Sequence, residues 1–115
     1  RNQAKPTSNG NGAAAGGALA SYVCSMMVRQ TRFFNNSAGL AGTSSGNGGA
    51  VNILGGRTLN PTNFTECIFD NNTAGGGTKV TGAGGQGGAV FLQEAIVNVD
   101  HCAFSNNVAH GSNTA

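Results

Sequence analysis

Four carboxylates are the side chains of this 115-residue chain whose chemistry could serve acid–base catalysis or calcium binding. A polysaccharide-cleaving site needs two acids that converge on one face, and a calcium site needs several oxygen ligands. Glu66, Asp70, Glu94 and Asp100 fall at four different positions of an internal repeat, so no two of them stack into a pair. We therefore expect isolated, solvated acids, with no catalytic residue, no cofactor and no hydrolase or lyase activity.

Signals for metal, phosphate and nucleic-acid binding are weak. His101 directly precedes Cys102, and adjacent residues of a strand point to opposite faces, so these two side chains cannot readily share a metal. The Gly-rich stretch 75–88 lacks the Lys-Ser or Lys-Thr ending of a phosphate loop and is typical of a linker. The six basic residues form no cluster, and no run of about 20 apolar residues occurs. The sequence thus predicts no metal site, no nucleic-acid partner and no membrane span.

The elements that position these residues follow from the repeat. The motif Gly-Gly-Ala plus an aliphatic residue occurs three times, and each copy is followed by Phe-x-Asn-Asn-x-Ala. The first motif occupies residues 16–19, 48–51 and 87–90, and the second occupies residues 33–38, 69–74 and 104–109. Residues 16–38 align with 87–109 without a gap, whereas the middle copy carries four extra residues near Gly55 to Pro61. Each unit of such a repeat buries its apolar face only by stacking on its neighbours.

Within each unit the apolar residues alternate in three short runs, as strands require. Val51 and Ile53 follow the second Gly-Gly-Ala, and Val90 and Leu92 follow the third. Three strands within 23 residues leave no room for a crossover helix. The sequence therefore predicts an all-β chain of about three triangular coils in an open-ended parallel β-solenoid. The predicted interior comprises Val51, Ile53, Phe64, Phe69, Val90, Leu92, Val97, Val99 and Phe104.

One asparagine closes each predicted coil. Asn36, Asn72 and Asn107 stand three residues after the repeated phenylalanine. Asparagine tolerates left-handed backbone geometry, and its amide can bond to backbone groups that would otherwise be buried without partners. Because stacked coils place the three amides above one another, we expect an inward-facing asparagine ladder.

Aromatic and sulfur-containing side chains also recur in register. The predicted stacking core comprises Phe33, Phe69, Phe104, Cys67 and Cys102. Thr31 fills the cysteine position in the first copy, and Cys24 aligns with Ala95. An odd number of cysteines with one stacked pair favours buried thiols. The alternative is a disulfide between Cys67 and Cys102, which the spacing of about 4.8 Å between adjacent strands permits.

The repeat also predicts the domain boundaries. Residues 1–15 read as a loop leading into the first coil, residues 16–109 as three coils, and residues 110–115 as the start of the next loop. Insertions 39–47 and 75–86 leave from the same corner and should flank one side. Neither end carries a polar capping coil, and an uncapped coil exposes unpaired strand edges and apolar side chains. We expect each end to be covered by a further coil of the same chain or of an identical one.

Three Asn-x-Ser/Thr sequons mark candidate N-glycosylation sites at Asn35, Asn63 and Asn71. Asn35 and Asn71 hold the same repeat position, one residue before the ladder, so they should point outward. A chain rich in asparagine, serine and threonine also produces sequons by chance, and a bacterial source would leave them unmodified. Both interpretations stay open at this point.

The paired motif resembles the repeat of the chlamydial polymorphic outer membrane proteins, in which Gly-Gly-Ala-[Ile/Leu/Val] accompanies Phe-x-x-Asn. The matching residues are 16–19 with Phe33 and Asn36, 48–51 with Phe69 and Asn72, and 87–90 with Phe104 and Asn107. The resemblance spans residues 16–109 and implies a right-handed parallel β-helix on a cell surface, acting in adhesion or as a structural stalk. The wider pectate-lyase-like superfamily, which shares that fold, includes polysaccharide lyases and hydrolases.

Two functions compete on this reading. The regular repeat, the separated acids and a charged content of only 9% favour a non-catalytic structural segment of an extracellular or cell-surface β-solenoid. It would be a fibre subunit stacked end to end, or a surface adhesin or stalk. Its partners would be further β-helical coils of the same or identical chains, together with any attached glycans. The competing hypothesis is a carbohydrate-binding or polysaccharide-processing β-helix whose site lies outside this segment.

Overall fold

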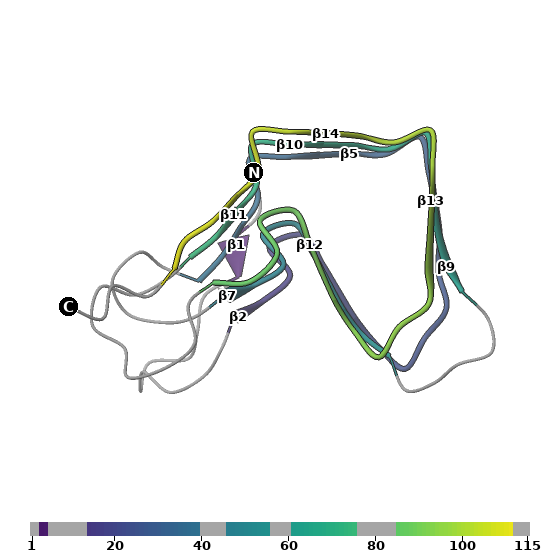
Figure 1. Ribbon diagram of the computed structural model, residues 1–115, viewed down its shortest axis with the longest axis horizontal. Coiled ribbons are helices and arrows are strands. Elements are labelled where there is room, and N and C mark those ends of the chain that lie inside the picture. Colours follow the sequence, from purple (N-terminus) through teal and green to yellow (C-terminus); the bar gives the residue numbers. More distant parts are fainter. Residues whose placement is uncertain (1–2, 5–13, 40–45, 56–60, 76–84, 112–115) are drawn as a thin grey trace.

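The computed structural model describes residues 3–4, 14–39, 46–55, 61–75 and 85–111, and within them the regular structure consists of strands alone (Figure 1). All pairings between these strands are parallel. The predicted all-β class is therefore confirmed for this part of the chain. No apolar helix of membrane-spanning length occurs among the same residues.

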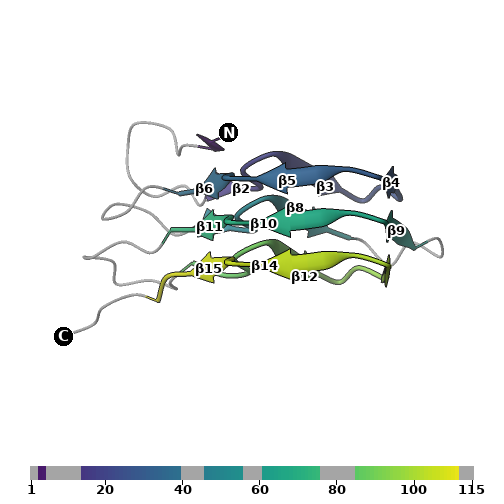
Figure 2. The same cartoon turned by 90° about the horizontal axis from the view of Figure 1, so that it is seen from above.

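The strands lie in three layers stacked on one another (Figure 2). The first layer contains β3 (Leu19–Tyr22), β4 (Met27–Arg29), β5 (Arg32–Phe34) and β6 (Ser37–Ala38). The second contains β8 (Val51–Leu54), β9 (Thr62–Thr65), β10 (Ile68–Asp70) and β11 (Thr73–Ala74). The third contains β12 (Val90–Gln93), β13 (Val97–Asp100), β14 (Ala103–Ser105) and β15 (Val108–Ala109). Each layer follows nearly the same path, so the layers overlay when viewed down the stack (Figure 1).

Equivalent strands of successive layers pair in the register that the repeat predicts. Phe33, Phe69 and Phe104 are direct partners, and so are the flanking positions of β5, β10 and β14. These pairings form four separate sheets, and a fifth, two-stranded sheet joins residues 14–15 to 46–47. The expected coil had three strands. The structure adds a short fourth strand after the asparagine position, where the backbone of Thr73 and Ala74 pairs with both neighbouring layers.

Left-handed backbone geometry marks the corners between these strands. The non-glycine residues with positive φ each directly follow a strand, and they are Val23 and Glu94, then Gln30, Glu66 and His101, and then Asn35, Asn71 and Asn106. The first glycine of each Gly-Gly pair, at Gly16, Gly48 and Gly87, is also left-handed. We expected this geometry at the ladder asparagines themselves. It falls instead on the preceding asparagine, because the chain turns at the end of the strand and only then directs the next amide inward.

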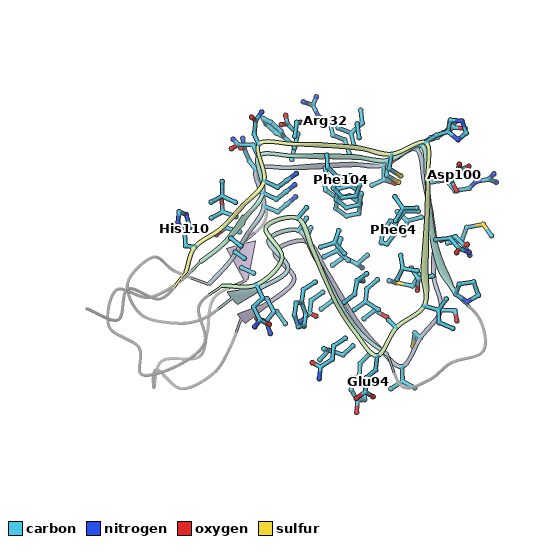
Figure 3. All side chains as sticks on the ribbon, in the orientation of Figure 1. Arg32, Phe64, Glu94, Asp100, Phe104 and His110 are labelled. Atoms are coloured by element: carbon cyan, nitrogen blue, oxygen red, sulfur yellow. The ribbon has the colours of Figure 1, made fainter. Side chains whose placement is uncertain are left out.

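The core lies inside the layers and is best formed in the middle one. The rings of Phe33, Phe69 and Phe104 stack in parallel, with centroids 4.7 and 4.6 Å apart. Phe64 meets Phe69 edge to face at 5.6 Å. The side chains of Val51, Ile53, Phe64 and Phe69 are buried, as predicted. Stacked parallel strands place identical side chains in contact, which accounts for the files of rings visible in Figure 3.

Three predicted core residues are not buried. Leu92, Val99 and Phe104 are 44%, 52% and 50% exposed, and Val90 and Val97 are half-buried. All belong to the third layer, which contacts another described layer on one side only. Their positions in the repeat were predicted correctly, but their burial was wrong because a side chain in such a stack is covered only when layers lie on both sides of it.

The N-terminal residues also depart from the expected loop. β1 (Gln3–Ala4) pairs in register with β6, and β2 (Ala14–Ala15) pairs with β7 (Gly46–Asn47). Phe33 in the first layer is only 7% exposed, so the two outer layers differ in how open they are. The interiors of the insertions after Gly39 and Gly75 lie outside the described residues.

The roots of the insertions stack on one another. The backbone N–H of Gly46 donates to Gly75 O at 2.9 Å, and that of Gly85 donates to His110 O at 2.8 Å. His110 in turn donates its own N–H to Ala74 O at 3.0 Å, so it continues the backbone pairing of the layers. Both insertions therefore leave the same side of the stack, as predicted.

Candidate functional site

The asparagine ladder runs through all three layers at the corner before β6, β11 and β15. Asn36 Nδ2 donates to Asn72 Oδ1 at 2.9 Å, and Asn72 Nδ2 donates to Asn107 Oδ1 at 2.8 Å. Asn72 Oδ1 also accepts the Asn36 backbone N–H, and Asn107 Oδ1 accepts that of Asn72, each at 3.0 Å. Asn72 Nδ2 and Asn107 Nδ2 donate further to the carbonyl oxygens of Phe33 and Phe69. The predicted inward ladder is thus a set of hydrogen bonds between layers in a buried corner.

The threonine–cysteine position forms a second file of inward side chains. Thr31 Oγ1, Cys67 Sγ and Cys102 Sγ each donate to the carbonyl oxygen two residues earlier, at 2.8, 3.4 and 3.3 Å. Both cysteines are free thiols, and Cys102 Sγ also accepts the Cys67 backbone N–H at 3.3 Å. A hydroxyl and a thiol make the same local bond, which explains how threonine replaces cysteine in the first layer.

The three sequon asparagines lie on the outside of the layers. Asn71 is exposed, whereas Asn35 and Asn63 are half-buried. Asn71 Nδ2 donates to Asn35 Oδ1 in the layer above, and Asn63 Oδ1 accepts from Asn98 Nδ2 at 2.9 Å. A hollow of about 330 Å³ lies at this corner, lined by Asn35, Asn36, Ser37, Asn71 and Thr73. The stacking of the layers places the sequons of Asn35 and Asn71 side by side, which neither sequon reveals when it is considered alone.

Asp70 is the acid with the densest set of polar partners. Its carboxylate accepts the Ser105 hydroxyl at 2.7 Å and the Asn106 amide at 3.2 Å, and it lies 3.6 Å from the Arg32 guanidinium. These hydroxyl and amide donors, followed by the charge of Arg32, hold the pKa of Asp70 below its ordinary value. The Arg32 guanidinium also lies 4.7 Å from the centre of the Phe34 ring. Asp70, Ser105, Asn106 and Arg32 therefore form a polar network around a single acid.

The remaining acids are separate from Asp70 and from each other. Asp100 pairs with Thr65 and contacts His101 Nδ1 at 2.7 Å, and both side chains are mostly exposed. Glu66 Oε2 accepts the Gln30 amide at 2.8 Å. Figure 3 shows Glu94 and Asp100 projecting outward from different sides of the layer. The strand pairings place Asp70 and Asp100 in different files, as the repeat alignment predicts.

Metal ligands do not gather in the described part of the chain, where no group of three His, Cys, Asp or Glu side chains is suited to an ion. His101 stands at a left-handed corner rather than within a strand, so our argument from strand alternation was wrong in its geometry. A surface hollow of about 210 Å³ spans the three layers and is lined by Tyr22, Val23, Leu54, Gly55, Gln93 and Glu94. Glu94 is the single acid in that hollow.

Sequence reasoning missed one buried polar side chain. Asn52 in β8 lies between Ala20 and Phe91 in the stack and is 2% exposed, although its neighbours Val51 and Ile53 take the inward positions. Its Oδ1 atom is buried without a hydrogen-bond partner. Strand alternation places Asn52 on the outer face of the layer. Alternation does not predict whether that face is buried, so the burial of Asn52 could not be predicted from it.

The open face of the third layer exposes several large apolar side chains. It carries the inward side chains of Leu92, Val99 and Phe104, and Ile96 and Val108 of the same layer are also exposed. Phe104 stacks on Phe69 with one ring face and leaves the other free of a described ring. Contiguous exposed apolar side chains of this kind mark an interaction surface.

Comparison of the chain with protein-family models, with curated proteins and with solved structures found no match.

Proposed function

We propose that the chain is a non-catalytic structural segment of an extracellular, right-handed parallel β-helix. It acts either as a fibre subunit or as part of a surface adhesin or stalk. The stacked layers with equivalent strands in one register support the solenoid reading. Connections between parallel strands are right-handed in about 98% of cases, which favours that hand. The resemblance of the repeat to chlamydial polymorphic outer membrane proteins supports a surface location.

One observation carries the structural role. Phe69 is fully buried between two layers, whereas Phe104 at the same repeat position is 50% exposed. A further layer of the same kind, from the same chain or an identical one, would bury Phe104 as Phe69 is buried. Burying apolar area stabilises by roughly 25 cal/mol per Å², so covering the third layer is strongly favourable. Parallel strand edges in the same layer would gain backbone partners at the same time.

The arrangement of the acids supports a role without catalysis. Asp70 is held by Ser105, Asn106 and Arg32, and neither surface hollow brings two acids together. We expect no cleavage of pectin-like or glucan polymers by the purified chain. Cleavage that disappears on mutation of Asp70 or Asp100 would contradict the proposal.

A chain extended by one layer tests the structural role directly. A second copy of residues 76–111 is joined after Gly111, so that the added β14 equivalent can stack on Phe104. We expect a higher melting temperature and less binding of an apolar fluorescent dye, because the former open face becomes internal. The matched control carries Asp in place of the added phenylalanine and Ala in place of the added ladder asparagine. If both extended chains melt like the parent, the layers do not stabilise one another and the proposal is wrong.

A further inference from the structure

We infer that the third layer of one chain docks on the first layer of a second copy, head to tail and in the register of the internal repeat. We call the outer side of the first layer the head, and the open face of Leu92, Val99 and Phe104 the tail. The inference rests on the proposed function in one respect, since it continues the stack of layers across a chain boundary. Beyond the proposed function, the inference identifies the partner as a second copy of the chain, the orientation as head to tail, and the charged residues that favour this orientation.

Charge is segregated along the stack. Among the described residues, the guanidinium groups are both in the first layer, at Arg29 and Arg32, and the carboxylates are in the second and third. Arg29 pairs with Thr65, which in turn pairs with Asp100, so the three occupy one file on the outer surface. A second copy in the same register would place its Arg29 directly next to Asp100, at the strand spacing of about 4.8 Å. In this file the head therefore presents a guanidinium and the tail a carboxylate, which His101 Nδ1 contacts at 2.7 Å.

Side chains in the same or adjacent files already make polar contacts between layers of one chain. Gln30 Nε2 reaches Glu66 Oε2 at 2.8 Å, and Ser105 Oγ reaches Asp70 Oδ1 at 2.7 Å. Arginine and aspartate are long enough to meet across the same spacing, and both Arg29 and Asp100 are exposed. Such a pair contributes little affinity at a surface, but a like-charge substitution on either side opposes docking and so enforces polarity.

The apolar groups of the two faces correspond as well. Leu19, Met26 and Val28 are half-buried in the first layer, in the files that hold Val90, Val97 and Val99 in the third. Contact between non-equivalent faces does not close on itself, so repetition gives an open filament. Strand edges that pair across the junction would add backbone hydrogen bonds of the kind seen within each sheet.

The strand β1 occupies the place that the neighbour's β15 would take. Gln3 and Ala4 pair with Ser37 and Ala38 of β6, as Val108 and Ala109 pair with the preceding strand β11. The sequence of β1 and the residue before it, Asn-Gln-Ala, also matches the Asn-Val-Ala that ends in β15. β1 thus covers the edge of β6, and docking in this register requires this two-residue strand to leave β6. Removal of β1 should therefore strengthen association.

Sedimentation velocity of the full chain, over a range of concentrations and salt, tests this inference. We expect association that grows with concentration and weakens with salt, because exposed charges are screened. Arg29→Asp and Asp100→Arg should each weaken association at least tenfold. The double reversal should restore self-association yet fail to associate with the unaltered chain. Glu66→Arg is the matched control, since it reverses a charge in the middle layer away from both faces and should leave association unchanged.

Deletion of residues 1–4 supplies the second arm. It should shift association to lower concentration, and electron micrographs should show longer filaments. A chain that stays monomeric with and without these residues, while the four-layer chain still gains stability, would overturn the inference and leave the proposed function standing. Dimers that stop at two copies and ignore Arg29→Asp would indicate tail-to-tail contact and would also overturn it. If the chain extended by one layer melts at the same temperature as the parent, that result would instead count against the proposed function.

Discussion

Replacing Asn72 with alanine is the sharpest test of what holds the layers together. Asn72 is fully buried, and its side chain makes four hydrogen bonds. Truncation removes the acceptor of the Asn36 backbone N–H, which lies 3.0 Å away, and a donor to Phe33 O. Asn107 Oδ1 keeps its bond from the Asn72 backbone N–H. The main loss is therefore the desolvated Asn36 N–H at a buried corner.

A buried polar group without its partner costs roughly 1–3 kcal/mol. With one backbone donor and one amide donor of Asn36 both losing this acceptor, we expect Asn72→Ala to lower the free energy of unfolding by about 2–3 kcal/mol. For a chain of this length 1 kcal/mol corresponds to about 4 °C, so the melting temperature should fall by about 8–12 °C. Thermal melts followed by far-UV circular dichroism give the measurement.

Asn98→Ala is the matched control. Asn98 Nδ2 also donates to an asparagine oxygen of the neighbouring layer, Asn63 Oδ1, at 2.9 Å, but Asn98 is exposed. Water replaces that bond, so this variant should melt within about 2 °C of the parent. If Asn72→Ala and Asn98→Ala melt alike, the buried ladder adds nothing that solvent does not supply, and our account of it is wrong.

Three further predictions, one with a control variant, test the backbone and the charges. Gly49→Ala should prevent folding as judged by circular dichroism, since a Cβ there would lie 1.9 Å from a carbonyl oxygen of the next layer, whereas Gly111→Ala meets no atom within 4 Å and should melt like the parent. Val23 adopts a φ of 53°, which is strained for a β-branched residue, so Val23→Gly should raise the free energy of unfolding by about 1 kcal/mol in denaturant titration. Hydrogen bonds, chiefly from the Ser105 hydroxyl, hold the pKa of Asp70 low, so its ionised form stabilises the fold above about pH 4 and that contribution is lost as pH falls through the folded pKa. Asp70→Asn should therefore flatten the decline in melting temperature below about pH 4, and an unchanged decline would show that other groups dominate it.

The stacking register was predictable because it repeats in the sequence. Phe33, Phe69 and Phe104 share a position, and the contact of like on like needs only that the layers follow the same path. The asparagine ladder followed from the same alignment. Burial was less predictable. Phe69 and Phe104 are the same residue type at the same position of the motif, but Phe69 has a described layer on both sides and Phe104 on one side only.

The corners could not be read from composition. Left-handed positions hold residues as different as Val23, Glu66 and His101, because a corner is imposed by the strands on either side of it. The outer polar contacts were equally hidden. The partners of Asp70 come from the first and third layers, and their side chains meet only after the layers have stacked.

The spacing of the layers along the chain has a kinetic consequence. Ladder partners are 36 residues apart between the first two layers and 35 apart between the last two. Closing a loop of that length costs about 3 kcal/mol of chain entropy before any layer contact repays it. During synthesis, the first layer can pair with the second only after the second has emerged from the ribosome. Formation of an interface between two unordered layers is then the slow event, whereas a layer that follows an ordered one folds onto an edge that is already in place.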